Sequence, residues 1–170
     1  MIHKKLQFDS MHAIIIVHNI IIRTGFFVAF KIIYKGNVEE FEEFMLSKAK
    51  QEYQTKGQGI LCKIADIYAR QLSMIEYDPY PPLEEKPLSD DDPPSIKHIT
   101  DYVEYKNFYR WGIAGGVTGN HRIIFAVHNF SKVILLHHFD KKYNGLIKRP
   151  DIEPAEEEYA NYCNVDPNLY

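Results

Sequence analysis

The sequence predicts an α+β domain: an antiparallel sheet meander with an N-terminal helical hairpin and a C-terminal helix. Three observations indicate this fold. Residues 121–142 read as two strands rich in Ile, Val and Leu, joined by a short turn. Residues 38–72 carry apolar side chains at helical spacing, broken once at Gly57 and Gly59. A last helical pattern begins near Pro150 or Pro154, and strands gathered together after helices are typical of α+β domains.

The 170 residues suffice for one domain with a sizeable core. We expect residues 1–25 to be an N-terminal extension, residues 26–162 to form the domain and residues 163–170 to be a tail. Within the extension, the apolar run 13–22 follows two lysines and is shorter than the ~20 residues that span a bilayer. This run is open to three interpretations: an added strand, a leader or a consequence of the choice of start, for which Met11 is an alternative, or a membrane anchor.

The domain is expected to begin with a strand over residues 26–34. Asn37 and Glu40 have the spacing of a capping box, which predicts the start of the first helix. The helical hairpin leads into an acidic, proline-rich loop over residues 77–95. Six of the nine prolines lie there, which excludes a helix interior or a central strand. The loop is interpreted as a solvated surface excursion or as an acidic cover for a basic site.

The second half of the chain supplies the sheet. Residues 97–104 are interpreted as a helical turn or an edge strand, and residues 105–113 as a strand. A glycine-rich loop over 115–119 leads to the central hairpin, whose strands we expect at 121–128 and 132–139. The turn of this hairpin is predicted at Asn129, Phe130 and Ser131.

The charge of the chain is unevenly distributed. The formal net charge is −3, which argues against a protein that coats nucleic acid over its whole surface. Residues 97–149 nevertheless carry nine Lys or Arg and three Asp or Glu, while residues 76–96 and 150–170 are strongly acidic. A basic block of this kind is suited to a polyanion, although solvated charge without a partner is the simpler alternative.

The basic and polar side chains of this block are of the types that phosphodiester cleavage requires. Attack of a ribose 2′-hydroxyl on the adjacent phosphate needs a base, a cation for the phosphoryl oxygens and an acid for the leaving oxygen. Alternation along the strands puts Arg122 on one face of its strand, while His138 and Lys142 share a face of the next. The predicted catalytic residues are Arg122, Lys142, His138 and Arg110, and the predicted substrate-binding residues are Lys106, Lys141 and Tyr143.

No metal site or cofactor is expected. His137 and His138 are neighbours on a strand and point to opposite faces, so they do not form a chelating pair. Cys62 and Cys163 are far apart and form neither a Cys-x-x-Cys pair nor a disulfide framework, which favours a reducing, cytoplasmic location.

The segment from Gly119 to Tyr159 resembles the C-terminal half of RelE/HigB-type toxins of bacterial toxin–antitoxin systems. The likeness covers about 60 residues when the preceding strand, with Lys106 and Arg110 at positions where the family has basic residues, is counted, and the rest of the chain follows the family only in its order of elements. The matching positions are Gly119, Arg122, Ile123, Ile134 to His137, Phe139, Lys141, Lys142, Pro150, Ile152, Glu153 and Ala155.

This resemblance implies a toxin that cuts mRNA on the ribosome without a metal and is neutralised by a cognate antitoxin, often a helix-turn-helix protein. It implies that Arg122 holds the scissile phosphate, and that Lys142, or Lys141 in a shifted register, is the basic residue after the last strand. The acidic net charge and Phe108, which stands where RelE-like members have lysine, depart from the family. The alternative is a non-catalytic or gyrase-directed ParE-like module that binds protein.

Overall fold

Five strands form one mixed sheet in the computed structural model, which describes residues 29–81 and 93–169. The strand order is β1-β5-β4-β3-β2. Strands β2 to β5 pair antiparallel in sequence order, so the predicted meander is confirmed, but β1 pairs parallel with β5 and the sheet is therefore not purely antiparallel. The strands are β1 (Lys31–Tyr34), β2 (Ser95–His98), β3 (Phe108–Ala114), β4 (Asn120–His128) and β5 (Lys132–Asp140).

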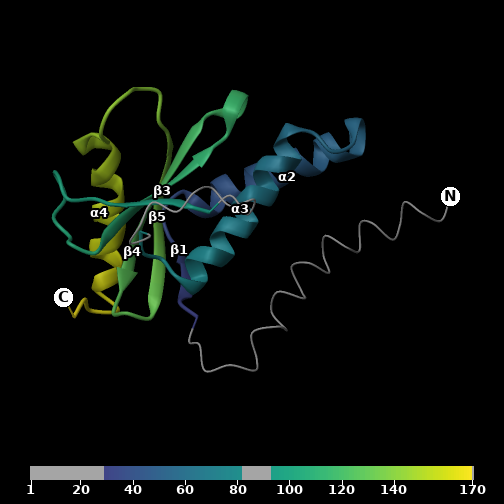
Figure 1. Cartoon of the computed structure of the whole chain (residues 1–170). Helices are drawn as coiled ribbons and strands as arrows, with labels where there is room; N and C mark the ends of the chain where they lie inside the picture. The colour runs from purple at the N-terminus through teal and green to yellow at the C-terminus, as the bar shows by residue number, and fades with distance from the viewer. Residues whose placement is uncertain (1–28, 82–92, 170) are drawn as a thin grey trace.

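Within the described ranges, three α-helices cover the two faces of the sheet, and the α+β prediction is confirmed (Figure 1). Helices α2 (Val38–Lys56) and α3 (Ile60–Tyr77) form the predicted hairpin, which extends well beyond the sheet, and α4 (Arg149–Cys163) lies against the opposite face. A short 3-10 turn, η2 (Gly116–Thr118), joins β3 to β4. None of the helices in the described ranges is long and apolar enough to cross a membrane.

Each face of the sheet has its own core. On one face, side chains of α2 and α3 pack against Trp111 and Phe125, both fully buried. On the other face, Ile152 and Tyr159 of α4 pack against Phe108. Burying large aromatic and aliphatic side chains stabilises the fold by about 1.5–3 kcal/mol each, so both helical layers are held mainly by the hydrophobic effect.

The start of α2 differs from the prediction. Asn37 occupies the N-cap position, but its side chain forms no cap hydrogen bond and the predicted capping box with Glu40 is wrong. The amide of Asn37 instead accepts from the His138 backbone N–H at 2.7 Å and donates to the His138 carbonyl at 2.9 Å. These two bonds pair the Asn37 amide with the backbone of β5 as a neighbouring strand would, and they fix the start of α2 to β5.

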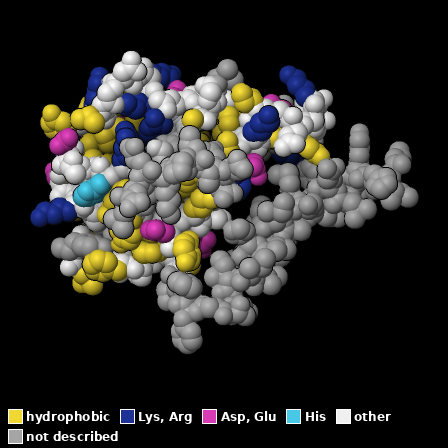
Figure 2. Space-filling view, viewed as in Figure 1, with side chains coloured by type: hydrophobic (Ala, Val, Ile, Leu, Met, Phe, Trp, Pro, Cys, Tyr) yellow, Lys and Arg dark blue, Asp and Glu magenta, His cyan; other side chains and the backbone are white. Residues whose placement is uncertain are grey.

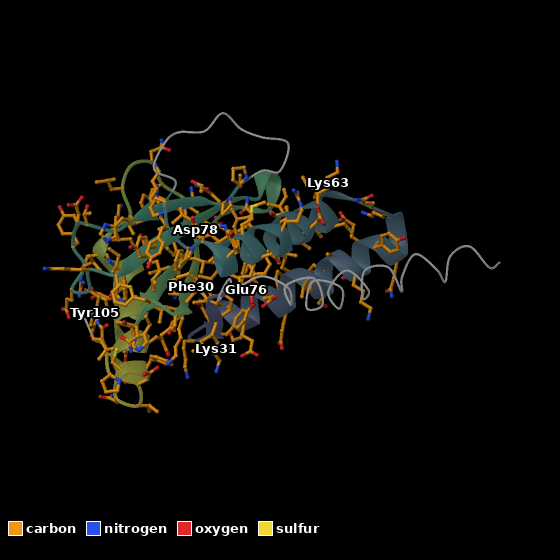
Figure 3. The ribbon with its side chains drawn as sticks, turned by 60° about the horizontal axis from the view of Figure 1, so that its bottom comes forward. Phe30, Lys31, Lys63, Glu76, Asp78 and Tyr105 are labelled. Atoms are coloured by element: carbon orange, nitrogen blue, oxygen red, sulfur yellow. The ribbon has the colours of Figure 1, made fainter. Side chains whose placement is uncertain are left out.

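Several strand boundaries differ from the expected ones. The edge strand β2 overlaps the segment 97–104 only at Lys97 and His98, β3 begins at Phe108 and not at residue 105, and the described part of the expected strand 26–34 is in strand only from Lys31. Pro150 lies in the first turn of α4, as expected. Phe30 donates its backbone N–H to the Glu76 carbonyl at 2.8 Å, which fixes the chain before β1 to the end of α3 (Figure 3). The predictions for the N-terminal extension and for the centre of the proline-rich loop fall on residues 1–28 and 82–92, outside the described ranges.

A β-bulge in β5 decides which side chains share a face at the end of the sheet. From the turn, Phe125 pairs with Leu135, but Ile124 pairs with His137, so Leu136 is an extra residue. A shift of one residue moves every later side chain to the other face of the sheet. Arg122 consequently lies opposite Phe139 and not opposite His138.

Candidate functional site: a basic groove beside α4

Three cations converge on the α4 face, at the end of the sheet where β5 leads into α4. Arg122 on β4 pairs with Gly112 of β3, and Arg110 lies two residues from Gly112 on the same face. Lys141 follows β5 two residues after Phe139, which is the partner of Arg122. We call the surface formed by Arg110, Arg122 and Lys141 the basic groove. Figure 2 shows Lys and Arg side chains gathered at this end of the molecule, over the loop that Figure 1 draws between β5 and α4.

Gly112 makes room for the Arg122 guanidinium. An added Cβ at Gly112 would lie 3.3 Å from both Cζ and Nη1 of Arg122 and 3.5 Å from its Nε. The guanidinium therefore lies directly over the glycine backbone. Its Nη1 donates to the His121 carbonyl at 2.7 Å, while Nε is buried and has no hydrogen-bond partner within the described residues. A buried donor without a partner is costly, and an anion would supply the missing acceptor.

The cations of the basic groove lack acidic partners. Within residues 29–81 and 93–169, no carboxylate lies at ion-pair distance from Arg110, Arg122 or Lys141. Burial and the charge of Arg110 lower the pKa of Arg122, and burial lowers the pKa of Arg110. Burial, Arg110 and Arg122 lower the pKa of Lys141, which is only 8% exposed. Mutual repulsion of this kind is relieved when a bound anion enters.

Tyr143 completes the groove from the loop after β5. Its hydroxyl donates to Asp151 Oδ2 and accepts from the Lys148 backbone N–H at 3.1 Å. The ammonium of Lys141 lies 4.8 Å from the centroid of the Tyr143 ring, and it also donates to the Gly145 carbonyl. Burial and the bond to Asp151 raise the pKa of Tyr143, so its hydroxyl stays protonated and donates to Asp151.

His138 does not join this group. It lies on the face of the helical hairpin, where its ring stacks on Phe41 at a centroid distance of 3.6 Å and its Nε2 lies 3.1 Å from Nδ1 of His121. Burial first, and then the two neighbouring histidines His121 and His137, lower the pKa of His138 to about 4. The imidazole is therefore neutral at pH 7, and it is on the opposite face of the sheet from Arg122.

Lys142 and Lys106 also lie apart from the groove. The side chain of Lys142 is 82% exposed, and its ammonium lies 3.8 Å from Asp140 Oδ2, an acid on the His138 face. The bulge explains why Lys142 and His138 lie away from Arg122, because a strand without the bulge would have put both side chains on the face of Arg122. Lys106 is exposed and precedes β3 at the end away from the Arg122 pair.

Sequence reasoning missed one cation. Lys97 of β2 pairs with Arg110 of β3, so it extends the basic groove to the edge of the sheet. The alternation of residues 95–98 carries the signal, but the segment 97–104 is open to a helical turn or an edge strand from its sequence, and only the strand assigns Lys97 a face.

The convergence of cations is suited to holding an anion. It does not test the prediction that the chain has no metal site. The described residues contain no group of three or more His, Cys, Asp or Glu side chains placed to hold a metal ion. Comparison with protein-family models, with curated proteins and with solved structures finds no match for this chain.

Proposed function

We propose that the chain is an RNA-cleaving toxin of the RelE/HigB kind, and that the basic groove holds the phosphate of the scissile bond in mRNA. One observation carries the proposal: three partly buried cations converge without an acidic partner among the described residues. The helical hairpin, the meander and the final helix follow the order expected from the resemblance, which adds support. As a toxin, the protein would be held inactive by a cognate antitoxin.

Arg122 is the residue that we assign to the phosphate. Its planar fork matches two phosphoryl oxygens, and it remains charged at physiological pH. One of its donors is already fixed by the His121 carbonyl, and Gly112 lies under the guanidinium. The group is therefore oriented before the substrate arrives, which is the condition under which a cation stabilises the charge that develops on phosphorus oxygens. Arg110 supports the same charge from the neighbouring strand.

Tyr143 and Lys141 are our candidates for proton transfer, in place of His138. In the proposed reaction the ribose 2′-oxygen bonds to phosphorus, the bond from phosphorus to the 5′-oxygen breaks, and a 2′,3′-cyclic phosphate remains. The Tyr143 oxygen takes the proton of the 2′-hydroxyl and passes its own to Asp151, to which it is already hydrogen-bonded. Lys141, whose pKa is lowered, gives a proton to the departing 5′-oxygen.

Growth arrest in a bacterial host tests the proposal. Expression of the unmodified chain without an antitoxin should stop growth and shorten mRNA within translated regions. Arg122→Ala should abolish both effects, because loss of a preorganised donor costs about 10²- to 10³-fold in rate. Lys142→Ala is the matched control: it removes the same type of charge from a side chain outside the groove and should leave the arrest intact.

Three results would go against the proposal. An Arg122→Ala protein that is folded and cuts mRNA at the unmodified rate would show that the groove is not the site of cleavage. Arrest without mRNA cleavage would favour the protein-binding, ParE-like alternative. Equal losses from Arg122→Ala and Lys142→Ala would show that general surface charge, and not the groove, is responsible.

A further inference from the structure

We infer that a pocket next to Arg110 is a subsite for one unpaired guanine base, adjacent to the phosphate in the basic groove. The inference rests on the proposed function and names a base preference for it. The pocket is open to solvent and has a volume of about 90 Å³. Its lining includes Lys97, Thr100, Asp101, Arg110, Leu146 and Ile147. Arg110 belongs to both the pocket and the groove, so a nucleotide whose phosphate lies in the groove can reach the pocket with its base.

Three charged side chains of the pocket are without partners among the described residues, whereas His98, which also lines the pocket, has its Nε2 2.6 Å from the Lys106 carbonyl oxygen. Within the described ranges, Lys97, Asp101 and Arg110 form no side-chain hydrogen bond and no ion pair. Asp101 therefore presents a free carboxylate, and Lys97 a free ammonium, at the same opening. Leu146 and Ile147 supply an apolar wall from the loop after β5. An apolar wall with a few converging polar groups is typical of small-molecule sites.

The two charges match the Watson–Crick edge of guanine. A carboxylate only accepts hydrogen bonds, and guanine offers it two donors side by side, the ring N1–H and the exocyclic amino group. The guanine O6 and N7 atoms are acceptors that suit a lysine. Uracil offers one donor flanked by two carbonyl oxygens, which the carboxylate repels. The pocket therefore selects guanine over uracil.

The size of the pocket implies a single-stranded ligand. An enclosed cavity of about 150 Å³ takes a benzene ring, so this smaller, open pocket admits the hydrogen-bonding edge of a base and leaves the sugar outside. In a duplex that edge is occupied by the complementary base. Sequence-specific recognition of RNA accordingly relies on unpaired bases read on these edges.

Binding of short 2′-O-methyl oligonucleotides tests the inference, since these cannot undergo 2′-hydroxyl attack. The probes are single-stranded hexamers of uridine, unmodified or with one central guanosine or inosine, measured by fluorescence anisotropy with the full chain at one salt concentration. We expect the guanosine probe to bind about tenfold more tightly than the uridine probe, in line with the discrimination given by one bidentate contact. Inosine lacks the exocyclic amino group and should fall between them.

Asp101→Asn should reduce the guanosine preference to about twofold or less, because the amide replaces one acceptor with a donor. The matched control is Asp66→Asn, which neutralises an exposed acid that pairs with Arg70 on α3, away from the groove, and should retain the preference. Asp101→Glu keeps the carboxylate and should retain a preference for guanosine over uridine. This result would show that the loss in Asp101→Asn comes from the carboxylate and not from a general disturbance of the loop.

The outcomes separate this inference from the function on which it rests. Equal binding of guanosine and uridine probes, lost in Arg122→Ala, would overturn the guanine subsite and leave the phosphate groove standing. A guanosine preference that survives in Asp101→Asn would also overturn it. Binding that is unchanged by Arg122→Ala would show that the basic groove does not bind the phosphate, and the guanine subsite would then be contradicted as well.

Discussion

Gly112→Ala is expected to lower activity without lowering stability. The added methyl carbon would lie 3.3 Å from Cζ and Nη1 of Arg122, closer than carbon atoms ordinarily pack, so the guanidinium must move by a few tenths of an ångström. Glycine within a strand is less stable than alanine by roughly 0.5–1 kcal/mol. This gain offsets the cost of moving one side chain, and the free energy of unfolding should change by less than about 1 kcal/mol.

The loss of activity should be larger than the change in stability suggests. A misplacement of about 1 Å at a reacting centre costs on the order of 100-fold in rate, so a shift of a few tenths of an ångström should cost about tenfold. Gly112→Val, with two more carbons, should approach the loss caused by Arg122→Ala. Urea unfolding gives the stability, and the rate of mRNA cleavage on translating ribosomes gives the activity.

A folded Gly112→Ala protein that cleaves at the unmodified rate would show that Gly112 does not orient Arg122. A loss of activity only in proportion to the folded fraction would show the same, because the glycine would then matter to the sheet and not to the orientation of Arg122.

Two further predictions concern stability. Tyr159→Phe should reduce the free energy of unfolding by about 1–3 kcal/mol, because the buried Tyr159 hydroxyl accepts a hydrogen bond from the Asn107 side-chain amide at 2.7 Å and lies 2.9 Å from His128 Nδ1. Denaturant unfolding at pH 7 measures the change, and an unchanged midpoint would contradict the prediction. Stability should fall by on the order of 2–3 kcal/mol between pH 6.5 and pH 4, because the pKa of His138 is lowered to about 4 in the folded state and the unfolded chain therefore binds more protons in that window. Unfolding series across this pH range should show a shallower slope for His138→Phe, and an identical slope would contradict the assignment.

Most of the fold could be predicted from the sequence because its signals are local. The consecutive apolar residues of β4 and β5, the helical stripes and the prolines are each determined by a few neighbouring residues. The parallel pairing of β1 with β5 is not a local property, since Lys31 and its partner Lys132 are a hundred residues apart. No pattern within either strand distinguishes a parallel from an antiparallel partner.

The candidate site could be predicted only in part, and the bulge at Leu136 is the reason. Arg110, Arg122, Lys141 and Tyr143 come together as a group of predicted residues. His138 and Lys142 do not, because one extra residue in β5 reverses the faces of everything that follows it. Near the bulge, Gly36 approaches the Leu136 carbonyl so closely that a Cβ would lie 2.1 Å from the oxygen. Such a contact between distant segments produces no periodic pattern in the sequence from which it could be predicted.

The central claim is that the cations of the basic groove neutralise RNA phosphates, and the salt dependence of binding tests it most directly. For single-stranded nucleic acid, the logarithm of affinity falls with the logarithm of salt concentration by about 0.7 for each phosphate neutralised. Contacts from Arg110, Arg122 and Lys141 predict a slope of about −2 for a short uncleavable RNA, and Arg122→Ala should reduce its magnitude by about 0.7. Lys142→Ala should leave the slope unchanged. A slope that is the same for the unmodified chain and for Arg122→Ala, or one that Lys142→Ala reduces equally, would contradict the account.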